Sequence, residues 1–262
     1  MPGMDSGERD DLVRTLTRRR EVLEALDDSA RRKPELAREL DVARSTVDRA
    51  IRQLQNQALV ERGEGGYELT TCGEVAVDLY GRFASRLDAL YDARDVVAKL
   101  PSREFAHPDV LDDAEVVRAA SSAPDRPVRA FLDLVEDAAH ARGFSPTAYG
   151  AYVDVFERRV VDAGMTAEFV FSDDALAELT TTHREPIQRA VETGRVAVHR
   201  IESLPMVGVS VLEREDGSRV LAMGVYDGTG MAALVQNDAP DALSWGESLV
   251  DDYLERADEM PL

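Results

Sequence analysis

The sequence predicts an α/β protein, α+β overall, with a small helical head, a long helix and a larger α/β domain. Three patterns predict this organisation. Apolar residues recur every three or four positions before residue 57, one long helical pattern follows residue 72, and helical and strand patterns alternate after residue 109. A chain of 262 residues is long enough for two domains, each with a core of its own.

The head is predicted over residues 9–71, after a small, polar tail at residues 1–8 that we expect to be disordered. It begins with a helix at about residues 9–27. Two shorter amphipathic helices follow on either side of the three-residue break 41–43, which is the length of the turn in a helix-turn-helix. Asp41 lies where glycine is commonest, although aspartate also tolerates a left-handed backbone.

The second short helix, residues 44–56, places Val47, Ile51 and Leu54 on one apolar face. After it, residues 59–62 and 67–70 flank a Gly-rich tip, a pattern typical of a β-hairpin. Three helices and a hairpin in this order predict a winged helix-turn-helix.

The other faces of residues 44–56 carry arginine, hydroxyl and amide side chains, which are suited to base edges and phosphates. The alternatives are ordinary core helices, or a winged head that binds protein. The candidate DNA-binding residues are Arg44, Ser45, Thr46, Arg49, Arg52, Gln53, Lys33 and Arg62.

Residues 72–100 read as one connector helix, with apolar residues mostly three or four positions apart, that ends before Pro101. We expect it to pair with its twin in a homodimer, because two heads on successive turns of DNA match a palindromic site. The alternative is that this helix packs only against its own second domain.

Residues 101–262 are predicted to form an α/β sensor or dimerisation domain in layers. The strands are expected at residues 115–120, 145–149, 167–171, 195–201, 207–213, 220–226 and 231–236, and the helices at residues 128–142, 153–163, after Ser172, 185–193 and 239–257.

Two stretches resemble known families. The run LARELDVARSTVDRAIRQLQNQALVER resembles winged helix-turn-helix regulators of bacteria and archaea. The segments MTAEFVFSDDALAEL, LPMVGVSVLE and AMGVYDGTGMAALVQND, with a near-terminal Trp-Gly-Glu helix, are similar to archaeal regulators that carry the FilR1 middle domain. The resemblance implies a transcription regulator, and by fold analogy alone a domain distantly like phospholipase D-type sensor domains.

The net charge of −20 is unusual for a DNA-binding protein. Residues 1–70 hold 13 Lys+Arg and 15 Asp+Glu, which leaves 18 and 36 for the remainder, so the acid is concentrated outside the head. Only two basic residues are lysines, Lys33 and Lys99, a balance that resembles proteins of salt-loving archaea. At molar salt the Debye length is about 3 Å, so general repulsion from DNA is screened. A protein that mimics DNA is the alternative.

With no signal peptide and no apolar run near 18 residues, we expect a soluble, cytoplasmic protein without a membrane partner. The one cysteine, Cys72, excludes an intramolecular disulfide and a Cys-cluster zinc site. The four histidines lack metal-binding spacing, and none has lysine two positions on, as phospholipase D-type catalysis requires. No Gly-x-Ser-x-Gly elbow is present. We therefore expect no enzyme activity, metal or cofactor.

A small-molecule site is predicted beyond the carboxyl ends of the strands, where open α/β sheets bind ligands. The alternative is that its serines cap helices and its aromatic residues belong to the core. The candidate ligand-binding residues are Ser121, Ser122, Tyr149, Ser172, Tyr226 and Trp245.

These patterns predict a dimeric, sequence-specific DNA-binding transcription regulator whose partners are double-stranded DNA, a second copy and a small metabolite effector. The alternative function is a protein-interaction adaptor whose winged head binds a partner instead of DNA.

Overall fold

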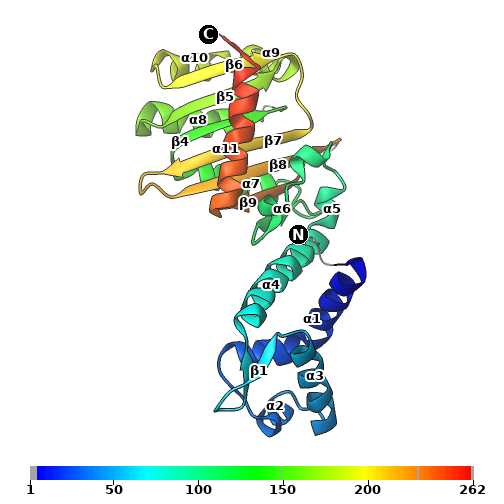
Figure 1. Ribbon diagram of the computed structural model, residues 1–262. Helices are drawn as coiled ribbons and strands as arrows, with labels where there is room; N and C mark the ends of the chain where they lie inside the picture. The colour runs from blue at the N-terminus through cyan, green and yellow to red at the C-terminus, as the bar shows by residue number, and fades with distance from the viewer. Residues whose placement is uncertain (1–4, 148, 229, 261–262) are drawn as a thin grey trace. The chain divides into compact units, whose positions relative to one another are not determined.

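In the computed structural model, residues 5–147, 149–228 and 230–260 are described (Figure 1). The chain divides into two compact units, Met1–Ser85 and Arg86–Leu262. Helices and strands occur together, so the predicted α+β class is confirmed.

The first unit has the predicted order of elements. Its core is formed by apolar side chains from all three helices, of which Leu36, Val47 and Ile51 are completely buried. The break between the second and third helices has a left-handed residue, Asp41, with φ of 49°. The elements are α1 (Ser6–Asp27), α2 (Lys33–Glu39), α3 (Arg44–Asn56), β1 (Val60–Arg62) and β2 (Tyr67–Leu69).

The wing is larger than the predicted hairpin. Strands β1 and β2 are antiparallel, and Arg31 adds a further bridge to Tyr67 through two backbone hydrogen bonds of 2.8 and 2.9 Å. Gly66 has φ of 142°, and a Cβ there would lie 2.3 Å from the Arg31 carbonyl oxygen. Only glycine therefore allows this close approach.

Part of the tail that was expected to be disordered is helical. Residues 1–4 lie outside the described residues, but α1 already begins at Ser6. The Glu8 carboxylate accepts a hydrogen bond from the Asp5 backbone N–H at 3.3 Å, which holds the start of the helix.

The single connector helix expected over residues 72–100 is interrupted. Helix α4 (Thr71–Asp92) ends at Asp92. A turn follows it and leads into a short helix, α5 (Arg94–Val97). Arg118 stabilises this turn, because its guanidinium donates to the Asp92 carbonyl oxygen at 2.6 Å and to Asp95 Oδ2 at 3.0 Å. After this turn, Val96 packs in the core of the second unit.

The second unit alternates helices and strands as far as residue 172, continues with two helices and four successive strands, and ends with a helix and a short strand. A short 3-10 helix, η1 (Arg103–Phe105), precedes them. The helices are α6 (Pro108–Leu111), α7 (Arg126–Glu136), α8 (Gly150–Ala163), α9 (Asp173–Thr182), α10 (Arg184–Glu192) and α11 (Pro240–Glu255). The strands are β3 (Glu115–Arg118), β4 (Ala138–Ser145), β5 (Thr166–Ser172), β6 (Val196–Ile201), β7 (Val207–Arg214), β8 (Arg219–Asp227), β9 (Gly230–Asn237) and β10 (Asp258–Glu259).

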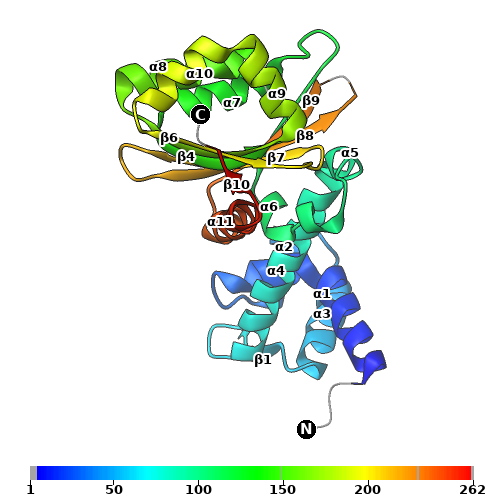
Figure 2. The ribbon, with the colours of Figure 1, turned by 90° about the horizontal axis from the view of Figure 1, so that it is seen from above.

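The strands form one mixed sheet in the order β10-β6-β5-β4-β7-β8-β9-β3. Strands β4, β5 and β6 are parallel to one another, and the pairs from β4 through β7, β8 and β9 to β3 are antiparallel. Helices α7 to α10 cover one face and α11 with α6 covers the other (Figure 2). The sheet therefore separates two apolar cores. This explains why all the interior residues of β8 are buried.

One predicted helix is wrong in its second half. The helix expected over residues 128–142 ends at Glu136, and residues 138–145 form the central strand β4. Alanine and arginine favour a helix locally, but pairing with both β5 and β7 outweighs this preference. The predicted weak strand at residues 145–149 is absent where it is described, and residue 148 lies outside the described residues.

Replacing Ala58 with glycine is expected to stabilise the first unit. Ala58 has φ of 55°, a conformation that costs an L-residue about 1–2 kcal/mol and glycine little. After the entropy of glycine in the unfolded chain is subtracted, Ala58→Gly should raise the free energy of unfolding by up to about 1 kcal/mol. Denaturant titration measures this. The matched control, Ala50→Gly in the buried face of α3, should lower it instead.

Candidate DNA interface and ligand cavity

Helix α3 buries one face and exposes the other. Val47, Ala50, Ile51 and Leu54 are each 0% exposed and pack in the core of the first unit. Among the candidate DNA-binding residues, those of α3 are all exposed: Arg44, Ser45, Thr46, Arg49, Arg52 and Gln53. Their exposure follows from helical periodicity, since burial of the apolar positions turns the polar positions outward.

Four candidate arginines are free to meet a partner. Within the described residues, Arg44, Arg49 and Arg52 on α3 and Arg62 on the wing form no hydrogen bond or ion pair through their side chains. The N-cap residue of α3, Ala43, has no side chain that accepts a hydrogen bond. The Thr46 N–H donates to the Ala43 carbonyl oxygen at 2.9 Å, whereas the N–H groups of Arg44 and Ser45 have no partner among the described residues, and such groups favour an anion.

Lys33 and Gln53 are already engaged. The Lys33 ammonium lies 2.7 Å from Asp48 Oδ1 and over the Tyr67 ring at 5.2 Å from its centroid. The hydrogen bond to Asp48 raises the pKa of Lys33, and the same bond lowers the pKa of Asp48. Gln53 Oε1 accepts a hydrogen bond from Arg19 Nε at 2.9 Å, which ties α3 to α1.

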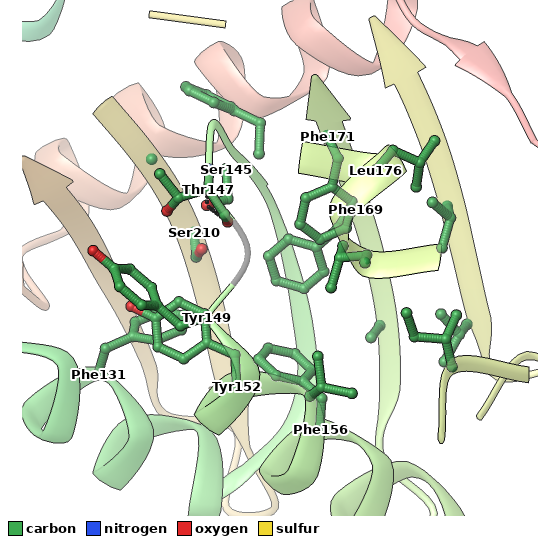
Figure 3. Close-up of a pocket in the computed structure, with 18 of the residues that line it drawn as sticks. Phe131, Ser145, Thr147, Tyr149, Tyr152, Phe156, Phe169, Phe171, Leu176 and Ser210 are labelled. Carbon is green, nitrogen blue, oxygen red and sulfur yellow. Dashed lines mark hydrogen bonds between the residues drawn. The ribbon is translucent and has the colours of Figure 1, made fainter. Parts of the chain in front are cut away.

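The second unit contains a cavity of about 130 Å³ between the sheet and helices α8 to α10. Figure 3 shows aromatic rings around it, among them Tyr149, Tyr152 and Phe156 from the start of α8 and Phe169 and Phe171 from β5. Tyr149 and Tyr226, two candidate ligand-binding residues, line this cavity. Burial raises the pKa of Tyr226, and it does the same for Tyr149.

The other four candidate ligand-binding residues lie elsewhere. Ser121 and Ser122 are exposed in a turn after the edge strand β3, and neither lines the cavity. Ser172 accepts a hydrogen bond from the Ala175 N–H at 3.3 Å, so it caps α9. Trp245 is on α11, which packs on the opposite face of the sheet, where its ring stacks on His107.

The sequence analysis did not identify several residues of the cavity. Tyr149, Tyr152 and Phe156 are spaced at i, i+3 and i+7 on α8, and Phe169 and Phe171 alternate on β5. Both spacings place aromatic side chains on one face. Helical spacing on α8 with strand alternation on β5 is therefore the signal that could have located the cavity.

Two facing glycines form part of the cavity wall. Gly208 on β7 pairs directly with Gly224 on β8, and both line the cavity. A Cβ on Gly224 would lie 3.2 Å from Tyr226 Oη, and one on Gly208 would lie 3.4 Å from the same ring. The pair therefore gives the Tyr226 ring room to lie against the sheet.

The histidines of β4 and β6 have polar side-chain neighbours. His140 Nδ1 is 2.6 Å from Thr166 Oγ1, and His199 Nε2 is 3.2 Å from Glu168 Oε1. Within residues 5–147, 149–228 and 230–260, no three His, Cys, Asp or Glu side chains are grouped as a metal site requires. In the same ranges, no helix has the length and apolar character needed to cross a membrane.

The chain combines a helical head that exposes arginines with a layered domain that contains a cavity. The family model described as "Methanogenesis regulatory protein FilR1, middle domain" matches residues 124–256, which are 133 of the 262 residues. The chain belongs to this family. A second model, the "HVO_A0261 N-terminal domain", matches residues 8–91.

Three solved structures are similar to this chain only at low TM-scores. TrmBL2, described as an archaeal chromatin protein with a novel mode of DNA binding, is 15% identical, with 96% of this chain and 99% of that chain covered and a TM-score of 0.42. NucT from Helicobacter pylori is 7% identical over 56% of this chain and 99% of that chain, with a TM-score of 0.43. The phospholipase D family member Nuc from Salmonella typhimurium is 11% identical over the same shares, with a TM-score of 0.40. No curated protein matches.

Substituting Asp48 is expected to strengthen any binding of this helix to a polyanion. Asp48→Asn removes a negative charge from α3 and releases Lys33 from its 2.7 Å ion pair. Affinity for double-stranded DNA should rise a few-fold. The slope of log K against the logarithm of the salt concentration should become more negative by about one, as expected for one more counterion released. Fluorescence anisotropy over a salt series measures both. The isosteric change Asp78→Asn on α4, which removes an exposed i,i+4 partner of Arg82, is the matched control and should leave both unchanged.

Proposed function

We propose that this protein is a sequence-specific, DNA-binding transcription regulator of archaeal type. The observation that supports it best is the exposed arginine and hydroxyl face of α3, opposite a fully buried apolar face. In a helix-turn-helix, the second helix enters the major groove with its first residues at the base edges. Arg44, Ser45, Thr46 and Arg49 occupy this position on α3.

Six of the eight candidate residues have an assigned role in the proposed complex. Arg49 lies near the middle of the exposed face and reads a guanine edge, because guanidinium pairs bidentately with O6 and N7. Ser45 and Thr46 bond phosphate or a base edge, and the free N–H groups at the start of α3 receive a phosphate. Arg62 on the wing and Arg52 on α3 contact the backbone. Lys33 joins them once it leaves Asp48.

The proposed regulator is a homodimer formed through α4. Five apolar side chains of this helix are roughly half exposed, and their spacing places them within about 120° of its circumference. Such a stripe is suited to an identical stripe on a second copy, because an isologous interface needs a self-complementary surface. The five residues are Val75, Leu79, Phe83, Leu87 and Leu90.

The second unit is proposed to sense a small molecule. A ligand with different affinities for two arrangements of the dimer would shift the population between them, and with it the spacing of the heads. This coupling needs no enzyme activity.

Arg49→Ala is expected to lower affinity for the operator. Loss of a bidentate guanine contact costs about 1–3 kcal/mol, so Kd should rise about 5- to 150-fold for the operator and much less for unrelated DNA. An operator first has to be selected from random DNA, after which gel-shift titrations in molar salt measure both affinities. The control is Arg129→Ala, an exposed arginine of α7 in the second unit. If the wild-type protein protects no DNA in footprinting, the function is that of a protein-binding adaptor.

Phe83→Glu is expected to weaken the dimer. Phe83 is 52% exposed in the middle of the α4 stripe, where a carboxylate would lie close to its symmetry mate. Analytical ultracentrifugation in high salt should show a shift from dimer to monomer. Val161→Glu on α8 is the matched control, since Val161 is an exposed apolar residue outside the stripe. An unchanged sedimentation coefficient for Phe83→Glu contradicts an α4 interface.

A further inference from the structure

The cavity of the second unit has a predominantly aromatic wall. Eight of its lining residues are phenylalanine or tyrosine, although the chain has only seven of each. Several rings lie edge to face, including Phe156 against Phe169 with centroids 5.3 Å apart and Tyr149 against Tyr152 at 5.1 Å. Aromatic rings prefer offset or edge-to-face neighbours at such distances. A flat ring therefore finds suitable partners on several sides.

One end of the cavity is polar. The phenol of Tyr226 lies beside the side chains of Ser145, Thr147 and Tyr152, whose interactions partly offset the increase in its pKa that burial causes. Ser145 Oγ donates to the Thr147 carbonyl oxygen at 2.8 Å. The buried Thr147 Oγ1 and Tyr152 hydroxyl both have the Tyr226 phenol as a polar neighbour. A hydroxyl can donate one hydrogen bond and accept others, so this group of hydroxyls has capacity left for a ligand oxygen.

The cavity offers no charge to a ligand. Its described lining contains no lysine, arginine or histidine. Its one acid, Glu157, accepts a hydrogen bond from Arg189 Nε at 2.6 Å. An ionised ligand would lose its hydration without gaining an opposite charge, which is unfavourable. The ligand is therefore neutral.

The size of the cavity limits the ligand to one ring. Drug-sized pockets span about 300–1,000 Å³. An apolar cavity of about 150 Å³ in another protein holds benzene. The present cavity, at about 130 Å³, is close in size to the cavity that holds benzene.

We propose that this cavity is a binding site for a neutral aromatic alcohol of the phenol class. The ring lies among Phe156, Phe169 and Tyr149, and the hydroxyl bonds with Tyr152 and Thr147. Binding itself does not depend on the proposed regulator function, whereas an effect of the ligand on DNA affinity rests on that function.

Binding is tested on the full chain with phenol, toluene and benzoate as probes. Isothermal titration calorimetry, supported by saturation-transfer NMR, should show one saturable site for phenol, weaker binding of toluene and no saturable binding of benzoate. Absence of saturable phenol binding at millimolar concentration overturns the proposal. Equal affinity for benzoate overturns the assignment of a neutral ligand.

Two variants locate the site. Tyr152→Phe keeps the ring and removes one hydroxyl, so phenol should bind about fivefold more weakly, the effect of one neutral hydrogen bond, while toluene is unaffected. The matched control is Tyr253→Phe, a buried tyrosine on α11 in the other core. Ala190→Leu on α10 fills the cavity and should abolish binding of both compounds. If Ala190→Leu fails to fold, as judged by circular dichroism, the comparison of Tyr152→Phe with its control still decides.

The effect on DNA is measured separately. Phenol at saturating concentration should shift the operator affinity of the wild-type protein and leave that of Ala190→Leu unchanged. If phenol binds but DNA does not, the proposed function fails and the cavity assignment stands. If DNA binds and phenol does not, the cavity assignment fails and the proposed function stands.

Discussion

The packing of the apolar side of α3 is the constraint on which the proposed reading head depends. Val47, Ile51 and Leu54 have no exposed surface, and burying each of them contributes roughly 1.5–3 kcal/mol. Rotating α3 by half a turn would expose all three and bury arginines instead. The core therefore fixes the outward direction of Arg44 and Arg49. The outward direction of these arginines does not depend on hydrogen bonds of their side chains. Their guanidinium N–H groups therefore stay available to a partner.

Charge distribution makes an acidic protein compatible with the proposed contact to DNA. The net charge of −20 is carried mainly by residues 71–262, whereas the head is close to neutral. At high salt, exposed charges further apart than a few ångströms are screened from each other, while directly contacting groups are not. Affinity then depends on the fit of α3 and less on the total charge. Asp48 reduces that affinity further by holding Lys33.

Local patterns predicted the head better than the second unit. Val47, Ile51 and Leu54 show helical periodicity in sequence, and the Gly-rich tip indicates the wing, so both were predictable from neighbouring residues. The strand at residues 138–145 was not, because its pairing partners lie far away in sequence and its own alanines favour a helix. Of the candidate ligand-binding residues, only Tyr149 and Tyr226 line the cavity. The other lining residues were not predicted, because the packing of α8 against β5 depends on tertiary structure. Serines that cap or turn the chain resemble ligand-binding serines until their partners are known.

The pairing of Gly208 with Gly224 makes the depth of the cavity a property of the main chain. A hollow formed by rotatable side chains can close when a rotamer changes, but an absent side chain cannot swing inward. The place of the Tyr226 ring against the sheet is therefore set by the main chain, whereas aromatic side chains form much of the remaining wall. A single methyl group at either glycine would contact Tyr226 and reduce the space, so related chains could acquire different guest preferences by one-residue steps at this pair.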